Sequence, residues 1–262
     1  MSEDFIITEK RGGVATVTIN RPGQRNAILR EMWRRLPEVL EELQADGSLR
    51  AAILRGGGER AFASGQDINE LRETTTREEA QAHSDLLESV LDRIEKIRIP
   101  LIAMVHGYAM GGAVGLLLVC DLRYAAGDAV VGVPAARLGV VYPEPFTRRL
   151  VRIVGPARAK EMLMAGRHYS AAEALEMGFF NHVLPKGELE AYVRETAGLI
   201  AENAPISVQN AKEIVRLIQD APLDPEAAQR ARALRLEGFS SQDFQEGVRA
   251  FLDKRKPTFK GV

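Results

Sequence analysis

Cysteine is almost absent from this chain of 262 residues, which contains only Cys120. A single thiol excludes an intrachain disulfide and is typical of proteins from a reducing compartment. An excess of one charge is also lacking, because 35 Lys and Arg residues face 36 Asp and Glu residues. The chain therefore has no general attraction for nucleic acid or for an anionic membrane. Residues 1–4 begin no apolar run, so we expect no signal peptide and a soluble, cytoplasmic protein.

Long apolar runs are rare as well. The exception is residues 101–120, which are long enough to span a bilayer. Pro100 precedes this run, His106 interrupts it, and the glycine pair Gly111–Gly112 breaks a helical register. A buried strand over residues 101–105, a turn and a buried helix that starts at the glycine pair explain the composition better. We therefore expect no membrane association.

Motifs for cofactors and metals are missing too. The chain has no GxxxxGK[ST] loop and no match to GxGxxG. Its four histidines have neither HxH nor HxxxH spacing and no cysteine partner, which argues against a metal site. Ser64 lacks the GxSxG surroundings of a hydrolase nucleophile. We expect neither a metal nor a separate cofactor.

Short β-rich segments alternate with amphipathic segments, which predicts parallel crossovers and an α/β structure. The β-rich segments are 5–8, 13–19, 51–54, 101–105 and 122–125, and helical spacing occurs at 29–43, 87–97 and after the glycine pair. Beyond residue 145 the pattern is mostly helical. The signals there are a capping box at Ser170–Glu173, a stop at Gly178, helical spacing at 208–218 and helix starts at Asp224–Pro225 and Ser240. We divide the chain into an α/β core, 1–195, and a helical C-terminal region, 196–262.

Two loops carry glycine between a buried strand and a helix: residues 63–67 and the pair Gly111–Gly112. One interpretation is that glycine only permits tight turns and close packing. The other is that each loop presents a free backbone N–H, and that the two donors converge as an oxyanion hole. Spacing alone leaves both interpretations open.

These loops resemble those of the crotonase (enoyl-CoA hydratase/isomerase) superfamily. The matching motifs, in family order, are NRPGQRNA at 20–27, FASGQDI at 62–68, IPLIAMVHGYAMGGA at 99–113, CDLRYAA at 120–126 and LGV at 138–140. The resemblance implies a spiral of ββα turns with a helical C-terminal trimerisation region. It also implies a homotrimer or dimer of trimers, with acyl-CoA thioesters as substrates.

The resemblance further implies that the N–H groups of Gln66 and Gly112 bind the thioester oxygen. It also assigns coenzyme A binding to four neighbours of Gln66 and to Lys254 near the C-terminus, which is expected to contact the phosphates. These five residues are Ser64, Gly65, Asp67, Ile68 and Lys254. For Asp67 we expect a role in capping or orienting its own loop rather than in chemistry.

Departures from the family pattern affect the chemistry. Family hydratases carry two glutamates at positions that are Gly115 and Ala135 here. Hydration needs a general base and a general acid, and neither glycine nor alanine has a side chain that can transfer a proton. Decarboxylation needs no base, because loss of CO2 leaves an enolate that an oxyanion hole can stabilise.

The sequence most resembles the methylmalonyl-CoA decarboxylases of the superfamily. LGVVY places Tyr142 where their carboxylate-orienting tyrosine lies, and the tail DFQEGVRAFLDKRKPTF is similar. Where these decarboxylases carry a histidine next to the glycine of the first loop, this chain has Gln66, so any role of an imidazole is lost.

Several alternatives remain open. Tyr142 is otherwise a residue at the edge of the core, and Glu144 is either a solvated loop residue or a relocated acid or base of a hydratase or isomerase. A scaffold without catalysis would also lack the two glutamates. An RNA-binding member is disfavoured, because residues 28–49 mix arginine with glutamate instead of forming a basic helix.

Overall fold

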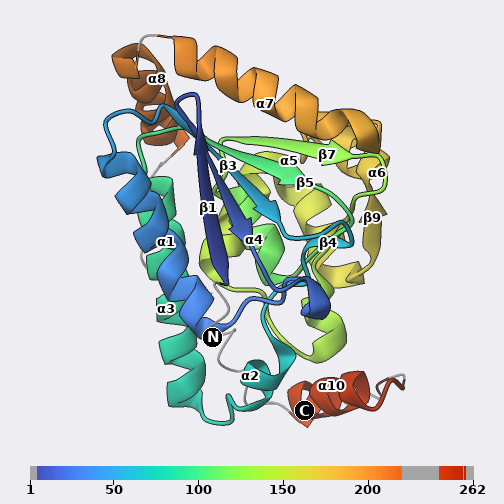
Figure 1. The fold of residues 1–262 in the computed structure, drawn as a ribbon. Helices are drawn as coiled ribbons and strands as arrows, with labels where there is room; N and C mark the ends of the chain where they lie inside the picture. The colour runs from blue at the N-terminus through green and yellow to red at the C-terminus, as the bar shows by residue number, and fades with distance from the viewer. Residues whose placement is uncertain (1–4, 204, 220–241, 256, 258–262) are drawn as a thin grey trace.

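The chain folds around two β-sheets, seen in Figure 1 in the computed structural model, which describes residues 5–203, 205–219, 242–255 and 257. The larger sheet has the order β1-β2-β3-β5-β7-β10, and the smaller has the order β4-β6-β8-β9. The larger consists of β1 (Ile6–Arg11), β2 (Val14–Ile19), β3 (Ala51–Gly56), β5 (Leu101–Val105), β7 (Leu122–Ala126) and β10 (His182–Leu184). The smaller consists of β4 (Ala61–Ala63), β6 (Tyr108–Met110), β8 (Val130–Gly132) and β9 (His168–Ser170).

The chain repeatedly steps from the larger sheet to the smaller one. β3 leads to β4, β5 to β6 and β7 to β8, and the strands of each set pair in parallel with one another. Helices α2 (Ile68–Arg72), α3 (Arg77–Glu95) and α4 (Gly112–Leu118) follow the first two of these steps. The fold is thus the crotonase-like spiral of ββα turns that the resemblance implied.

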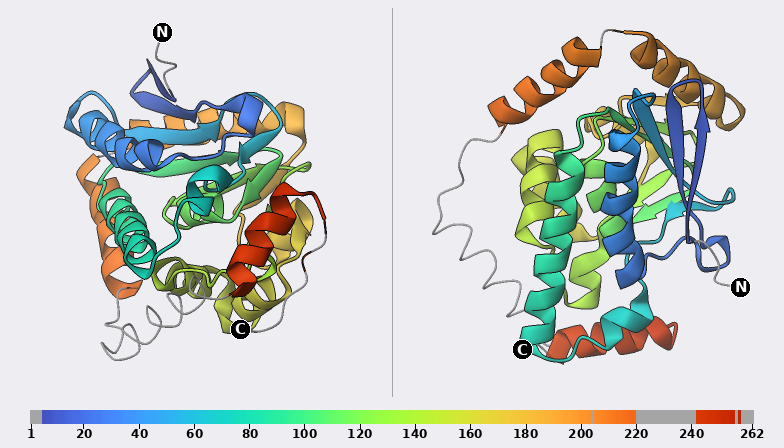
Figure 2. Two further views of the ribbon diagram at one scale, coloured as in Figure 1. Left: turned by 90° about the horizontal axis from the view of Figure 1, so that it is seen from below. Right: turned by 60° about the vertical axis from the view of Figure 1, so that its left-hand side comes forward.

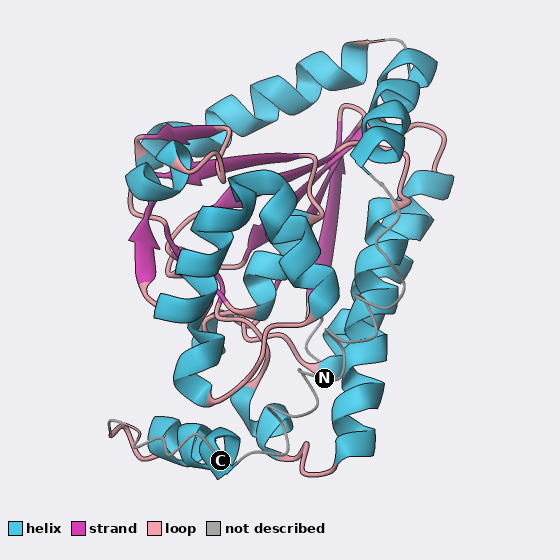
Figure 3. Ribbon diagram, turned by 180° about the vertical axis from the view of Figure 1, so that it is seen from behind, coloured by secondary structure: helices cyan, strands magenta, loops and turns pink. Residues whose placement is uncertain are grey.

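Helices enclose the strands, as the view from behind shows (Figure 3). α1 (Arg30–Ala45) and α3 pack side by side, and α4 is buried between the sheets and α5 (Glu144–Ala165). α7 (Lys186–Glu202) covers the other face of the larger sheet with Leu189, Val193 and Ala197. α7 runs unbroken through residue 195, and both its halves pack on the sheet. The division of the chain at residue 195 stays a prediction.

The segments predicted from longer patterns are confirmed. The N-terminal hairpin, α1, β3, α3, β5, β7, α6 (Ala171–Glu176) and α8 (Pro205–Gln219) all occupy the expected stretches. The apolar run 101–120 is β5, β6 and α4, and none of the described helices is both long and apolar enough to cross a membrane. The strands of the smaller sheet have three residues each, too few to show an alternating pattern.

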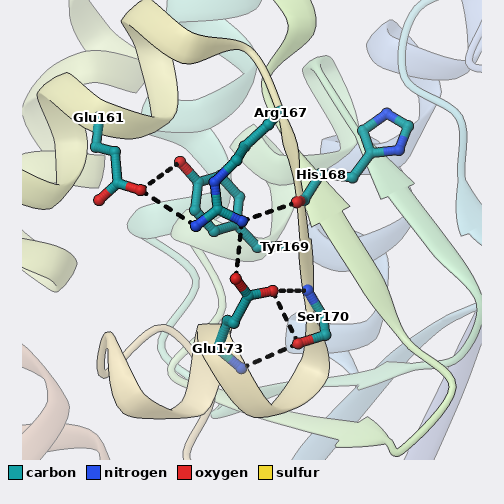
Figure 4. Close-up of polar contacts among 6 residues, drawn as sticks. All are labelled: Glu161, Arg167, His168, Tyr169, Ser170 and Glu173. Carbon is teal, nitrogen blue, oxygen red and sulfur yellow. Dashed lines mark hydrogen bonds and ion pairs between the residues drawn. The ribbon is translucent and has the colours of Figure 1, made fainter.

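The capping box predicted at Ser170 is present and stabilises the corner between α5 and α6. The Ser170 hydroxyl accepts a hydrogen bond from the N–H of Glu173 at 3.2 Å, and the Glu173 carboxylate accepts from the N–H of Ser170 at 2.8 Å. Arg167 lies over the ring of Tyr169 and pairs with Glu173 at 2.8 Å (Figure 4). This corner fixes β9, the edge strand that pairs with β8.

α10 (Gln242–Leu252) lies beside α2 at the end of the molecule away from α7 (Figure 2). Phe244 and Val248 pack against Leu71 of α2, and Gly247 approaches the backbone of Leu138 in η2 (Pro134–Leu138). The helix starts predicted at Asp224–Pro225 and Ser240 lie outside the described residues. Trimerisation through the C-terminal helices stays a prediction.

Candidate active site

The candidate site lies where two glycine-bearing loops touch. Residues 64–67 link β4 to α2, and Gly111 links β6 to α4. Gly65 has a φ of 94°, and a β-carbon there would lie 2.6 Å from the carbonyl oxygen of Met110 and 3.2 Å from the backbone nitrogen of Gly112. The backbone conformation and the close approach of the loops both require glycine at position 65.

Each loop carries a backbone nitrogen close to this contact, that of Gln66 in the first loop and that of Gly112 at the end of the second. A β-carbon on Gly112 would lie 3.5 Å from the backbone nitrogen of Gln66, so the two nitrogens border one point. Within the described residues no hydrogen bond engages either N–H, although Ile28 donates to the carbonyl of Gly65 at 2.8 Å. Neighbouring backbone N–H groups that no described residue engages can stabilise an oxyanion where they converge, so the assignment of Gln66 and Gly112 to an oxyanion hole stays a prediction.

Ser64 and Asp67 hold the first loop in place. The N–H of Ser64 donates to the carbonyl of Arg25 at 2.9 Å. Asp67 is the N-cap of α2, where its carboxylate accepts from the N–H of Asn69 at 3.0 Å and from Arg21 at 3.0 Å. Burial opposes ionisation of Asp67, but these hydrogen bonds outweigh burial and keep its pKa below the usual value. The expected capping role of Asp67 is confirmed.

Tyr142 holds the second loop. Its hydroxyl donates to the carbonyl oxygen of Gly111 at 3.0 Å, while the N–H of Gly111 donates to the carbonyl of Gly132 at 2.9 Å. Burial raises the pKa of the Tyr142 phenol, so it keeps its proton. A hydroxyl has one proton to donate, and here Gly111 takes it. Tyr142 therefore contacts the second glycine loop in this conformation, and its expected contact with a substrate carboxylate stays a prediction.

An aromatic ring fills the space beside Gly115. A β-carbon at this position would overlap the ring of Phe146, which is 1% exposed and comes from α5. A glutamate side chain on this face of α4 would have to displace that ring. Ala135, the second position where a glutamate is missing, lies in η2 and packs against the core.

Glu144 is the first residue of α5, and its side chain is 9% exposed. The guanidinium of Arg148, one turn further, lies 3.6 Å from the carboxylate. Glu144 is thus a shielded, paired carboxylate and not a solvated loop residue. Its role in proton transfer stays a prediction.

The assigned coenzyme A residues outside the loop lie on or near two packed helices. Ile68 begins α2 and contacts the cluster that α10 forms with this helix. Lys254 follows α10 at an exposed position with a φ of 52°. Its contact with phosphates stays a prediction. In the part of the chain that the structure describes, no three His, Cys, Asp or Glu side chains are placed to hold a metal ion.

Two residues at the site escaped the sequence analysis as functional residues. Trp33 lies within the helical pattern expected over residues 29–43, but nothing in that pattern indicates that its ring packs against Gly112. Phe146 could have been inferred indirectly. Glycine is unfavourable inside a helix, so Gly115 indicates that a bulky neighbour packs there.

Comparisons with known proteins find similarity along nearly the whole chain. A family model described as enoyl-CoA hydratase/isomerase matches residues 9–262. The short-chain-enoyl-CoA hydratase of Clostridium acetobutylicum is 36% identical over 98% of this chain and 97% of that protein.

Solved structures show the same similarity. Methylmalonyl-CoA decarboxylase in complex with 2-nitronate-propionyl-CoA superposes with a TM-score of 0.90 at 30% identity, covering 99% of both chains. An enoyl-CoA hydratase/carnitine racemase from Magnetospirillum magneticum gives a TM-score of 0.80 at 36% identity, covering 100% of this chain and 97% of that one.

Substituting Gly65 tests the close approach of the loops. We expect Gly65→Ala to lose thioester turnover and to lower the free energy of unfolding by more than the roughly 1–2 kcal/mol that left-handed strain costs. Gly12→Ala is the matched control, because Gly12 also has positive φ but nothing within 4 Å of a β-carbon. Urea unfolding and turnover measure both effects. Equal losses of stability in the two variants would contradict the contact.

Substituting Gly115 tests whether Phe146 fills the space beside it. We expect Gly115→Ala to destabilise the protein by about 1–3 kcal/mol, the usual cost of overpacking. Gly198→Ala in α7, where nothing lies within 4 Å, is expected to be neutral or stabilising. Adding Phe146→Leu to Gly115→Ala should recover part of the loss in urea unfolding. A destabilisation that is the same with Phe or Leu at position 146 would rule out the overlap.

Proposed function

The chain belongs to the enoyl-CoA hydratase/isomerase family, and from this premise we propose that it decarboxylates a short 2-substituted malonyl-CoA thioester. The observation that carries the proposal is the ring of Phe146 beside Gly115, where a hydratase glutamate would need room. The retained pair of N–H donors at Gln66 and Gly112 supports it.

The proposed reaction uses few protein groups. The bond between the α-carbon and the carboxylate breaks and CO2 leaves. The electron pair of the broken bond stays with the α-carbon and forms the enolate. The N–H groups of Gln66 and Gly112 donate to the thioester oxygen as it gains negative charge, and each such donor typically lowers the barrier by about 2.7–4 kcal/mol. A proton then adds to the α-carbon. Coenzyme A is part of the substrate, so the reaction needs no separate cofactor.

In this proposal Tyr142 is a positioning residue. Its hydrogen bond to the carbonyl of Gly111 fixes the peptide that precedes Gly112. Gly111 has φ 53° and ψ −115°, a conformation that the bonds to Tyr142 and Gly132 hold on both sides. The direction of the Gly112 N–H depends on this conformation.

Hydration of an enoyl-CoA is the second candidate. The name of the Clostridium acetobutylicum relative favours it, as does Glu144, a shielded carboxylate two residues after Tyr142. This reaction would need Glu144 to leave Arg148 and serve as acid or base.

Product analysis separates the two candidates. We expect mass spectrometry to find propionyl-CoA and CO2 from methylmalonyl-CoA, and negligible 3-hydroxybutyryl-CoA from crotonyl-CoA, because no glutamate pair is available to activate water. Efficient hydration without CO2 release would overturn the proposal. In that case loss of hydration in Glu144→Gln would identify the relocated group.

Tyr142→Phe tests the positioning role. We expect kcat for CO2 release to fall about 10-fold while KM changes less than about 2-fold, because the lost hydrogen bond orients a donor that acts in the transition state. Steady-state kinetics with methylmalonyl-CoA measure both constants. A raised KM with unchanged kcat would instead indicate that the hydroxyl binds the substrate carboxylate.

A further inference from the structure

Trp33 is buried against the oxyanion loops. It lies on α1, is 0% exposed, and is the only tryptophan of the chain. A β-carbon on Gly112 would lie 3.1 Å from Cζ2 of Trp33, 3.8 Å from its Cη2 and 3.5 Å from the backbone nitrogen of Gln66. The indole edge therefore packs against Gly112, on the side that also faces the backbone nitrogen of Gln66.

The indole N–H of Trp33 has no hydrogen-bond partner among the described residues. Nε1 and Cζ2 are both bonded to Cε2, so this N–H lies two bonds from the atom nearest Gly112. Indole nitrogen only donates hydrogen bonds, and a buried donor is normally paired. The side-chain Nε2 of Gln66 is also buried, and none of the described residues pairs with it. Two unpaired side-chain donors thus accompany the two backbone donors.

Within the part of the chain that the structure describes, no acceptor engages either of these side-chain donors. The carbonyl of Gly111 already accepts from Tyr142, and Glu144 is paired with Arg148. A thioester oxygen would occupy the backbone donors at Gln66 and Gly112. The remaining donors therefore match an acyl group that brings further acceptor oxygens, as a carboxylate does.

We propose that the indole N–H of Trp33 donates to a carboxylate oxygen on the acyl group, which makes Trp33 a specificity-determining residue for carboxylated thioesters. This inference rests on the proposed acyl-CoA function and names the group that recognises the acyl carboxylate. Burial removes competing water from the N–H, so a ligand without an acceptor leaves the donor unpaired. Acyl-CoA ligands with purely apolar acyl groups would gain nothing from it.

Because Trp33 is the only tryptophan, a tryptophan analogue changes this one position. Growth of a tryptophan auxotroph on β-(3-benzothienyl)alanine replaces the N–H by sulfur and keeps the shape of the ring. Trp33→Phe removes the N–H genetically. Leu36→Ala, 1% exposed and about one turn further along α1, is the control for lost packing.

Calorimetry with two stable coenzyme A thioethers gives the readout. S-(2-carboxypropyl)-CoA and S-propyl-CoA differ only in the carboxylate, and neither can undergo the proposed reaction. We expect the analogue to weaken binding of the carboxylated ligand about 10- to 100-fold, because a hydrogen bond to a charged group is lost. Binding of the propyl ligand should weaken less than about 3-fold. Leu36→Ala should leave the ratio of the two dissociation constants unchanged.

Equal weakening of both ligands, or no weakening of either, would overturn the inference. Emission of Trp33 gives a second measurement, since only the carboxylated ligand should shift it, and an identical response to both ligands would also count against the inference. Neither readout requires turnover. If the analogue no longer discriminates between the two ligands and the natural protein releases no CO2, the proposed reaction is refuted but the role of Trp33 stands. If the analogue still discriminates and the natural protein releases CO2, the reaction stands and the role of Trp33 is refuted.

Discussion

The contact between the loops at Gly65 and Gly112 is the constraint on which the site depends. Two backbones can approach this closely only where no side chain stands between them, and a β-carbon on Gly65 would fall against the carbonyl of Met110. The smaller sheet sets up the approach, because β4 and β6 pair in parallel and both loops leave from their carboxyl ends. Asp67 then fixes one loop, and Tyr142 fixes the other.

Beyond the loops, apolar packing fills the face of α4 next to the two backbone donors. Phe146 occupies the space beside Gly115 and packs edge-on against Tyr142, with ring centroids 5.2 Å apart. The face of α4 from which a hydratase would project a carboxylate is thus part of the core. Chemistry that produces an enolate without removing a proton suits such a site.

The same fold serves different reactions within this family, because activity depends on a few side chains around a common backbone arrangement. A hydratase relative at 36% identity and a decarboxylase structure with a TM-score of 0.90 are therefore compatible findings. Overall identity reports mostly on the core and the loops. The residues on which the proposed chemistry depends are few: Gly115, Ala135, Phe146 and Trp33.

The sequence by itself determined the alternation of strands and helices, the two glycine loops and the absence of glutamate at positions 115 and 135, because these are local patterns. The capping role of Asp67 was also within reach, since a cap acts on its own helix. The sequence did not reveal the short strands of the smaller sheet. Strands of three residues are stabilised by their neighbours in the sheet and not by their own pattern.

Only the tertiary structure decided what surrounds the oxyanion donors. It directs the proton of Tyr142 to Gly111, 31 residues away in the chain, and brings the ring of Phe146 against Gly115. It also sets Trp33 of α1 beside Gly112. Such contacts join segments that are distant in sequence, and they depend on how particular side chains fill one shared volume, which no local spacing of residues encodes.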